Sequence, residues 1–397
     1  MENKKFDDIL NLKLNIGKLS FKLVDLIFVI CIWTFAFLLR IKLFPIVSGD
    51  FHGCLSVWMD DIRFYGPVDS FKHDISNYTP PYLYLMCLVS GIENDLYALK
   101  SISVFFDYVG SIAIFMIIYE LTKSVRKSII GMTLLLISPA VVLNSAYWCQ
   151  CDMIYSSFVL FAFYAFLKKN SSACMILLGV ALSFKLQTVF ILPFFLIMWL
   201  KNKNIRILDA IYIPFTYIIM MIPAIAMGKP LRKALLVYFE QTNTYPYGTM
   251  EYPNLYVFLD EGIEKYHHLY DVSDAGLYLA IILLAILAFY LYSKSFELTN
   301  EIVILIALFS VSIACYTLPH MHDRYGMLID LLAIIYLVLK PSKIPMYVSL
   351  CVVTILTYMK FLIGTHVAEF WMVAVAMLAI IVYMGRELFF LVERGKE

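Results

Sequence analysis

Long apolar runs separated by short polar loops dominate this sequence. A run of roughly 20 apolar residues can cross a bilayer as a helix, whose backbone hydrogen bonds are all internal. Hydrophobic residues make up 62% of the 397 and charged residues 15%, against about 25% charged in a soluble domain. The sequence therefore predicts an all-α polytopic membrane protein. Twelve runs are predicted to be spans: 23–43, 98–121, 127–144, 153–167, 171–184, 187–200, 207–227, 275–293, 301–318, 324–339, 344–363 and 366–385.

The apolar segment 80–92 is shorter than a span and begins with two prolines, Pro80 and Pro81. Proline is tolerated in the first turn of a helix. We therefore expect an interfacial helix here, within a long outer loop at 44–97. A second long outer loop is expected at 228–274.

Basic residues predict which loops face the cytoplasm, because cytoplasmic loops carry an excess of lysine and arginine. The predicted cytoplasmic side also receives both termini, and its basic residues are Lys4, Lys5, Lys13, Lys18, Lys22, Lys123, Arg126, Lys127, Lys168, Lys169, Lys201, Lys203, Arg206, Lys294, Lys340, Lys343, Arg386, Arg394 and Lys396. The opposite face receives the two long loops and turns at 145–152, 185–186 and 319–323. The net charge of +1, without a run of basic residues, argues against a nucleic-acid partner.

Residues 320–325, His-Met-His-Asp-Arg-Tyr, place two imidazoles, a carboxylate and a guanidinium at the edge of a span. Charged groups there are costly and mark candidate functional sites. Alone, the motif fits a metal loop, a proton relay, an interfacial cap or a phosphate site, since arginine can bind two phosphate oxygens at once. A metal site built from His320, His322 and Asp323 is not favoured, because Arg324 beside it would repel a cation.

Other unusual polar residues fall on the same predicted face. Asp50 follows the first span, Gln150 and Asp152 lie at the outer end of the third, and Lys185 interrupts an apolar run. Each also has a purely structural interpretation: a solvated loop for Asp50, a capping carboxylate for Asp152, and snorkelling to the interface for Lys185.

Several charged residues, among them Asp25, Arg40, Asp107, Asp209 and Asp330, lie in or at the ends of predicted spans. Arg40 lies near the end of the first, whereas Asp107 and Asp330 lie deeper within theirs. We expect these carboxyl groups either to pair with a basic side chain of a neighbouring helix or to be protonated.

Six short motifs, taken in order, resemble those of the GT-C superfamily of integral-membrane glycosyltransferases. The likeness is greatest to the glucosyltransferases and mannosyltransferases that use polyprenyl- or dolichyl-phosphate sugars, and to their bacterial relatives. The motifs are GDFHGCLSVWM (49–59), NYTPPYLYLM (77–86), YWCQCD (147–152), FKLQTVFILP (184–193), NLYVFL (254–259) and HMHDRY (320–325). The sequence departs from the family pattern at His52, Cys149 and Asp323, where an acidic residue, glycine and glutamate respectively are common.

The resemblance implies an inverting hexosyltransferase with a catalytic module at about 1–227 and more variable helices at about 228–397. It implies that Asp50 is the general base and that a polyprenyl-phosphate-linked sugar is the donor. A lipid-linked or glycan acceptor is implied, with no cofactor; a divalent metal is not favoured. The implied donor-binding residues are Gln150, Asp152, Lys185, His320, His322 and Arg324, and the implied acceptor-binding or architectural residues are Trp58, Tyr78, Gln187 and Asn254.

Two other functions remain open for this sequence. A transporter or flippase of a lipid-linked or anionic substrate would also have about a dozen spans, although transporters tend to bind near the midplane and show internal repeats. A membrane polysaccharide polymerase is the second alternative. The site is expected on the extracytoplasmic face of a bacterial plasma membrane, or on the luminal face of the endoplasmic reticulum.

Overall fold

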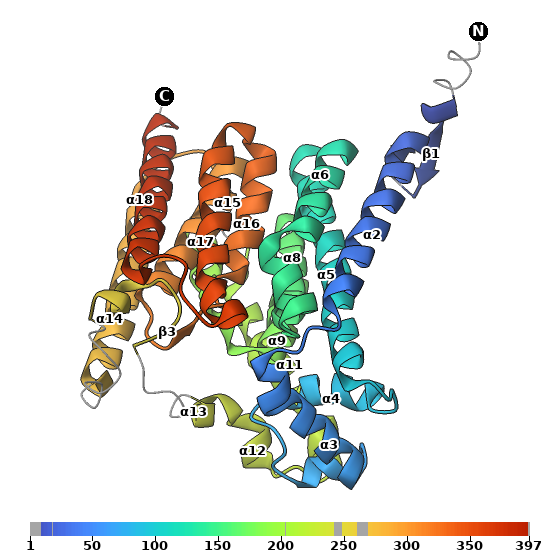
Figure 1. Ribbon diagram of the computed structural model, residues 1–397. Helices are drawn as coiled ribbons and strands as arrows, with labels where there is room; N and C mark the ends of the chain where they lie inside the picture. The colour runs from blue at the N-terminus through green and yellow to red at the C-terminus, as the bar shows by residue number, and fades with distance from the viewer. Residues whose placement is uncertain (1–8, 18, 203, 242–247, 260–268, 396–397) are drawn as a thin grey trace.

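The computed structural model of the protein describes residues 9–17, 19–202, 204–241, 248–259 and 269–395. Its long helices run roughly side by side, and short helices cover one end of the bundle (Figure 1). One hydrophobic cluster extends from Ala36 in the first long helix to Val392 in the last. The described chain is therefore all-α in its long elements, as the sequence predicts.

The elements in the first half are β1 (Lys13–Ile16), β2 (Leu19–Lys22), α2 (Leu23–Leu43), η1 (Phe51–Leu55), α3 (Ser56–Tyr65), η2 (Asp69–Lys72), α4 (Pro80–Val89), α5 (Asp95–Thr122), α6 (Val125–Ile137), α7 (Pro139–Val142), η3 (Leu143–Tyr147), α8 (Asp152–Leu167), α9 (Ser171–Phe184), η4 (Leu186–Ile191) and α10 (Leu192–Asn202). The second half has η5 (Ile207–Ile211), α11 (Tyr212–Ala226), α12 (Leu231–Leu235), α13 (Val237–Gln241), β3 (Thr249–Met250), η6 (Leu255–Leu259), α14 (Leu269–Ser293), α15 (Asn300–Thr317), β4 (Met321–His322), α16 (Met327–Leu339), η8 (Pro341–Lys343), α17 (Ile344–Ile363) and α18 (Phe370–Arg394).

Seven helices among the described residues are long and apolar enough to span a membrane, which makes this a polytopic membrane protein. An eighth is added if α6 and the segment Pro139–Tyr147, bent by 46°, form one broken span. Proline at the start of α7 explains the break, because it cannot donate the next helical hydrogen bond. The remaining four predicted spans correspond to shorter apolar helices, namely α8, α9, Leu186–Lys201 and α16. The count of twelve spans thus stays a prediction.

Two predicted span boundaries are wrong in a way that affects the site. The run predicted at 324–339 begins as helix only at Met327, because residues 321–325 form a short strand and a turn. Arg324 therefore lies in a loop and not in a helix. The run predicted at 366–385 begins at Phe370 and continues to Arg394, which leaves residues 364–369 as an ordered turn.

The first outer loop is largely helical. The predicted interfacial helix forms as α4, with both prolines in its first turn. It packs against the bundle, since the Tyr84 hydroxyl donates to the Met220 carbonyl (3.0 Å) and accepts from the Ala224 amide (2.9 Å). The loop is thereby tied to α11, at the end of the bundle where α3 and α12 lie (Figure 1).

The basic loops gather at the opposite end, together with β1 and the end of α18 (Figure 1). Arg126 lies 3.5 Å from Asp25 at the start of α2, and Lys294 lies 2.8 Å from Glu393 near the end of α18. Lys201 donates to the Lys294 carbonyl. Of the basic residues predicted to share this side, Lys4, Lys5, Lys18, Lys203 and Lys396 lie outside the described residues.

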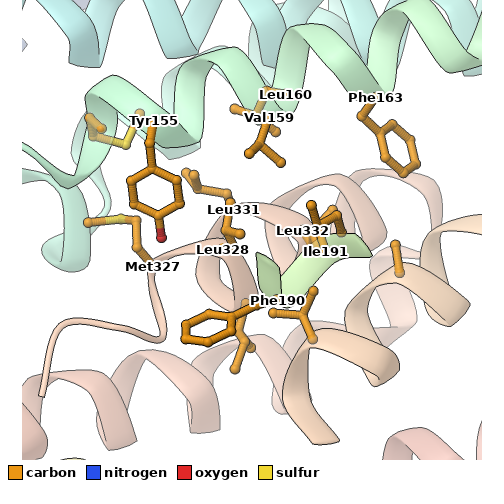
Figure 2. Packing of buried hydrophobic residues seen from close by; sticks show 14 of the residues in the cluster. Tyr155, Val159, Leu160, Phe163, Phe190, Ile191, Met327, Leu328, Leu331 and Leu332 are labelled. Atoms are coloured by element: carbon orange, nitrogen blue, oxygen red, sulfur yellow. The ribbon is translucent and has the colours of Figure 1, made fainter. Parts of the chain in front are cut away.

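The centre of the bundle is packed by apolar side chains. Figure 2 shows Tyr155 and Phe163 of α8 facing Leu328 and Leu332 of α16, with Phe190 of η4 beside them. Helix α15 is also enclosed, with 89% of its residues buried. These short and central helices are surrounded by protein, which leaves the longer peripheral helices to present their apolar faces outward.

One ion pair lies inside this packing. Arg40 of α2 and Asp107 of α5 are completely buried and 2.7 Å apart. The guanidinium also donates to the carbonyls of Ala36 and Leu136, and Asp107 accepts from Ser145. The predicted pairing of Asp107 with a basic side chain is confirmed. Asp330, in contrast, accepts its hydrogen bonds from the Thr354 hydroxyl, at 3.0 and 3.1 Å.

Candidate active site

A cavity of about 730 Å³ opens where the outer loops meet the ends of the helices. This volume lies in the range of ordinary small-molecule sites. Its wall is formed by six segments of the sequence, comprising Asp50, Cys54, Leu55, Trp58, Asn77, Tyr78, Trp148, Gln150, Thr249, Met250, Glu251, Val257, His322, Asp323, Arg324, Phe361, His366, Glu369, Phe370 and Trp371. Three of the five tryptophans of the chain lie on this wall.

Asp50 is fixed on the cavity wall by two side-chain donors. The indole of Trp148 donates to Asp50 Oδ2 at 2.8 Å, and the amide of Gln150 donates to the same oxygen. Arg324 Nη1 lies 3.8 Å from it. Among the described residues, these contacts all converge on Oδ2, so Oδ1 is the oxygen available to a ligand.

The segment that carries Asp50 is anchored from helix α5. Lys100 is buried, and its ammonium donates to the carbonyls of Leu43 (3.0 Å), Phe44 (3.1 Å) and Ile46 (2.6 Å). An ammonium group has three donors, and all three are used here. The negative end of the α2 dipole adds to this attraction. Lys100 thus fixes the chain four residues before Asp50.

A second anchor lies still closer to Asp50. The hydroxyl of Ser48 donates to the Trp148 carbonyl at 2.6 Å and accepts from the Phe51 amide at 3.2 Å. Trp148 is itself held by Phe361 of α17, with the rings stacked 3.9 Å apart. The carboxylate and its indole donor are therefore positioned by the same contacts.

Arg324 lies at the centre of a buried charge network. Its Nε is 3.6 Å from Asp152 Oδ2 and its Nη1 is 3.7 Å from Asp323 Oδ1. Asp152 also accepts from Lys185 Nζ at 2.6 Å and from Asn144 at 2.7 Å. Among the described residues, the buried Arg324 Nε has no hydrogen-bond partner. Its donor capacity is therefore incompletely used.

The loop that presents Arg324 is held by a short pairing of strands. Strand β3 runs parallel to β4, with Met250 opposite His322, and the Asp323 amide donates to the Met250 carbonyl at 3.0 Å. The Arg324 amide donates to the Asp323 carboxyl at 2.9 Å. The second outer loop, which contains β3, thus contacts the motif 320–325.

Burial changes the charge of two residues beside Arg324. It raises the pKa of Asp323 to about 8, and it lowers the pKa of His322 to about 3, with Arg324 and Lys185 adding to the effect on His322. At neutral pH, Asp323 is therefore mostly protonated and His322 is neutral. Among the predicted donor-binding residues, the positive charges are those of Arg324 on the cavity wall and Lys185 behind it, and His322 contributes a neutral imidazole.

Aromatic rings complete the wall next to this network. Tyr78 lies against Trp58, with ring centroids 5.1 Å apart, and Lys185 Nζ lies 5.5 Å from the Tyr78 ring. Burial raises the pKa of Tyr78, so its hydroxyl remains protonated.

The structure brings most of the predicted site residues together. Those on the cavity wall are Asp50, Trp58, Tyr78, Gln150, His322 and Arg324. Asp152 and Lys185 lie directly behind Arg324.

Besides Asp152 and Lys185, three predicted site residues are not among those that line the cavity. Gln187 forms a side-chain hydrogen bond with Tyr325. Asn254 donates to the Leu318 carbonyl at 3.2 Å and accepts from the Tyr256 amide at 3.1 Å, so its position is architectural. The backbone amide of His320 donates to the Gly248 carbonyl at 3.0 Å.

Several residues of the site were not predicted. Lys100 lies within a predicted span, and only its unusual charge there could have drawn attention to it. The ordered turn before α18 contributes His366, Glu369 and Trp371, which were placed in or beside an ordinary span. No group of three or more His, Cys, Asp and Glu residues in the described part of the chain is arranged to hold a metal ion.

Comparison with known proteins does not assign the chain to a family. No protein-family model matches the sequence, and a search of curated proteins finds no match.

Proposed function

We propose that the protein is an inverting glycosyltransferase of the GT-C type that uses a polyprenyl-phosphate-linked hexose. The observation that carries this proposal is the placement of Asp50 and Arg324 on the wall of one cavity, 3.8 Å apart. A carboxylate with one available oxygen suits a general base. A guanidinium on the same wall suits a phosphate.

In the proposed reaction, the acceptor hydroxyl transfers its proton to Asp50 Oδ1 as its oxygen attacks the anomeric carbon. The bond from that carbon to the phosphate oxygen breaks, and the electron pair leaves with the polyprenyl phosphate. The leaving group gains one negative charge, which Arg324 stabilises with support from Lys185 behind it. The proton on Asp50 then passes to the solvent, since this carboxylate is one-third exposed.

The proposed orientation places the cavity on the extracytoplasmic or luminal face and both termini in the cytoplasm. It is supported by the gathering of basic loops at the end of the bundle opposite the cavity (Figure 1). In this orientation the donor lipid lies in the outer leaflet, and the acceptor is a lipid-linked or surface glycan.

A transfer assay tests the proposal directly. Purified protein in lipid nanodiscs is supplied with polyprenyl-phosphate mannose or glucose, or with the corresponding nucleotide sugars, together with lipid-linked acceptors. We expect transfer only from the lipid-phosphate donor, with inversion at the anomeric carbon by NMR. Transfer only from the nucleotide sugar would overturn the proposal, as would movement of unmodified lipid-linked sugar across liposomes without transfer.

A further inference from the structure

The cavity has a second polar wall, distinct from the one around Asp50. Glu251 immediately follows β3, and His366 and Glu369 lie in the turn before α18. Glu251 Oε2 lies 3.0 Å from His366 Nε2. This contact connects the second outer loop to the end of α17.

The two walls differ in charge. The first wall carries the Arg324 guanidinium beside Asp50, with the paired Lys185 and Asp152 behind it. The second wall presents two carboxylates, and its imidazole contacts Glu251. A phosphate would be repelled from this wall, because like charges across an interface disfavour binding. The second wall therefore suits a neutral group with hydroxyl donors, which carboxylates accept well.

An exposed aromatic ring extends this wall. Trp371 is 50% exposed although it lines the cavity, and it follows Glu369 by two residues. Phe370 between them is held against His366, with ring centroids 4.7 Å apart. A large ring with a polar edge, next to carboxylates, can cover the apolar face of a sugar while its hydroxyl groups are bound alongside.

The backbone at Glu251 is also unusual. Its φ is +66°, a left-handed conformation that is strained for a residue with a side chain. The conformation is maintained by a bridge to His322 and by the adjacent turn, in which the Tyr252 amide donates to the Thr249 hydroxyl at 3.2 Å. Such strain tends to persist where a side chain must be presented in one direction.

Building on the proposed function, we propose that Glu251, Glu369 and Trp371 form the acceptor-binding part of the cavity, and that it binds a neutral, hydroxyl-rich saccharide. Glu251 and Glu369 accept hydrogen bonds from sugar hydroxyl groups, and Trp371 stacks on the sugar face. The acceptor is thus held by carboxylates that repel a phosphate, away from the arginine that binds the donor.

Saccharide binding can be measured without any transfer. Saturation-transfer NMR with the purified protein compares methyl mannoside and methyl glucoside with glucuronic acid, which has similar size and a negative charge. We expect stronger signals from the neutral sugars. The double variant Glu251→Gln/Glu369→Gln should reduce this discrimination, and Trp371→Ala should remove most of the signal. Equal binding of neutral and anionic sugars by the unmodified protein would overturn the proposal.

Kinetics provide a second and independent readout. Glu369→Gln is expected to raise the acceptor KM about tenfold to a hundredfold, as expected for loss of a hydrogen bond to a charged group, while the donor KM stays the same. The matched controls are Glu93→Gln in an exposed turn and Phe390→Leu at the far end of α18, neither of which lines the cavity. Both controls should leave the acceptor KM unchanged.

The outcomes separate this inference from the proposed function. Transfer with an unaltered acceptor KM in Glu369→Gln and Trp371→Ala would overturn the saccharide subsite and leave the transferase proposal intact. Selective binding of neutral sugars without transfer from any donor would support the subsite and overturn the transferase proposal.

Discussion

Two arginine–carboxylate groups in this protein differ in burial and in the distances between their charged atoms. Arg40 and Asp107 are 2.7 Å apart and completely buried, and the pair has further hydrogen bonds with two backbone carbonyls and a serine hydroxyl. Arg324 lies 3.6–3.8 Å from its three carboxyl partners, and Asp50 is one-third exposed to a cavity. The first arrangement is enclosed by protein, and within the described residues Arg40 Nη2 and Asp107 Oδ1 have no hydrogen-bond partner, whereas the second faces a cavity that a ligand can enter.

This difference separates a charged pair that stabilises the fold from a charged group that can act on a ligand. Both groups contain the same residue types, so residue identity alone does not separate them. Breaking the fully enclosed pair should affect folding, whereas changing the group on the cavity wall should affect binding and chemistry while the fold persists.

The largest effect on activity is expected from Asp50→Asn. Asparagine keeps an oxygen to accept from Trp148 but cannot take a proton from the acceptor. General-base catalysis contributes about 10²–10⁴-fold, so transfer should fall by that factor with normal expression and thermal stability. Asp60→Asn, an exposed carboxylate in the same outer loop, is the control and should behave like the unmodified protein. Comparable turnover by both variants would rule out Asp50 as the base.

Breaking the buried ion pair between Arg40 and Asp107 should instead affect the stability of the fold. Asp107→Ala leaves the Arg40 guanidinium buried without its partner, and removal of one member of a buried pair costs about 3–5 kcal/mol. The double variant Arg40→Met/Asp107→Leu should recover much of this loss, because apolar replacements of a buried pair are often tolerated. Thermal unfolding monitored by size-exclusion chromatography measures both. Normal stability of Asp107→Ala would contradict the interpretation of this pair as structural.

A smaller effect, on donor binding, is expected when Arg324 on the cavity wall is changed. Arg324→Lys keeps the charge but loses the planar fork, so a bidentate contact with phosphate is lost. The donor KM should rise about tenfold to a hundredfold, as for loss of a hydrogen bond to a charged group, while the melting temperature changes little. Lys72→Arg, an exposed cation elsewhere in the first outer loop, is the control. A higher acceptor KM with an unchanged donor KM would contradict the assignment of Arg324 to the phosphate.

Much of the fold and of the site could be predicted from the sequence. Apolar runs mark the helices, and the order of the loops determines the face on which each polar residue lies. The predicted spans 23–43 and 344–363 coincide with α2 and α17. Counting loops also placed Asp50, Gln150 and Arg324 on one face, and the structure brings them into one cavity. Their separations of about 100 to 270 residues along the chain left the contact distances undetermined.

The remainder depends on tertiary contacts that have no local signal. In the sequence, Lys100 looks like any other charged residue near the end of a span. Only the folded structure shows that it donates to three backbone carbonyls of another segment. The start of α16 at Met327 depends on the pairing of β4 with β3, some 70 residues earlier. The neutral state of His322 follows from burial beside two cations, which the motif alone does not reveal.

The smallest predicted effect concerns pH and Asp323. Its pKa of about 8 lies above the ordinary value of 3.8, so the folded protein holds a proton there that the unfolded chain releases at lower pH. Its contribution to stability is therefore present below about pH 4 and is lost as the pH rises to about 8. Above that pH, Asp323 becomes an anion beside Arg324 and should weaken donor binding. Asp323→Asn keeps an acceptor for the Arg324 amide and removes this ionisation, so its donor KM should stay flat where that of the unmodified protein rises. His322, with a pKa of about 3, does not titrate in this range, so identical profiles for the two proteins would show that Asp323 is not responsible.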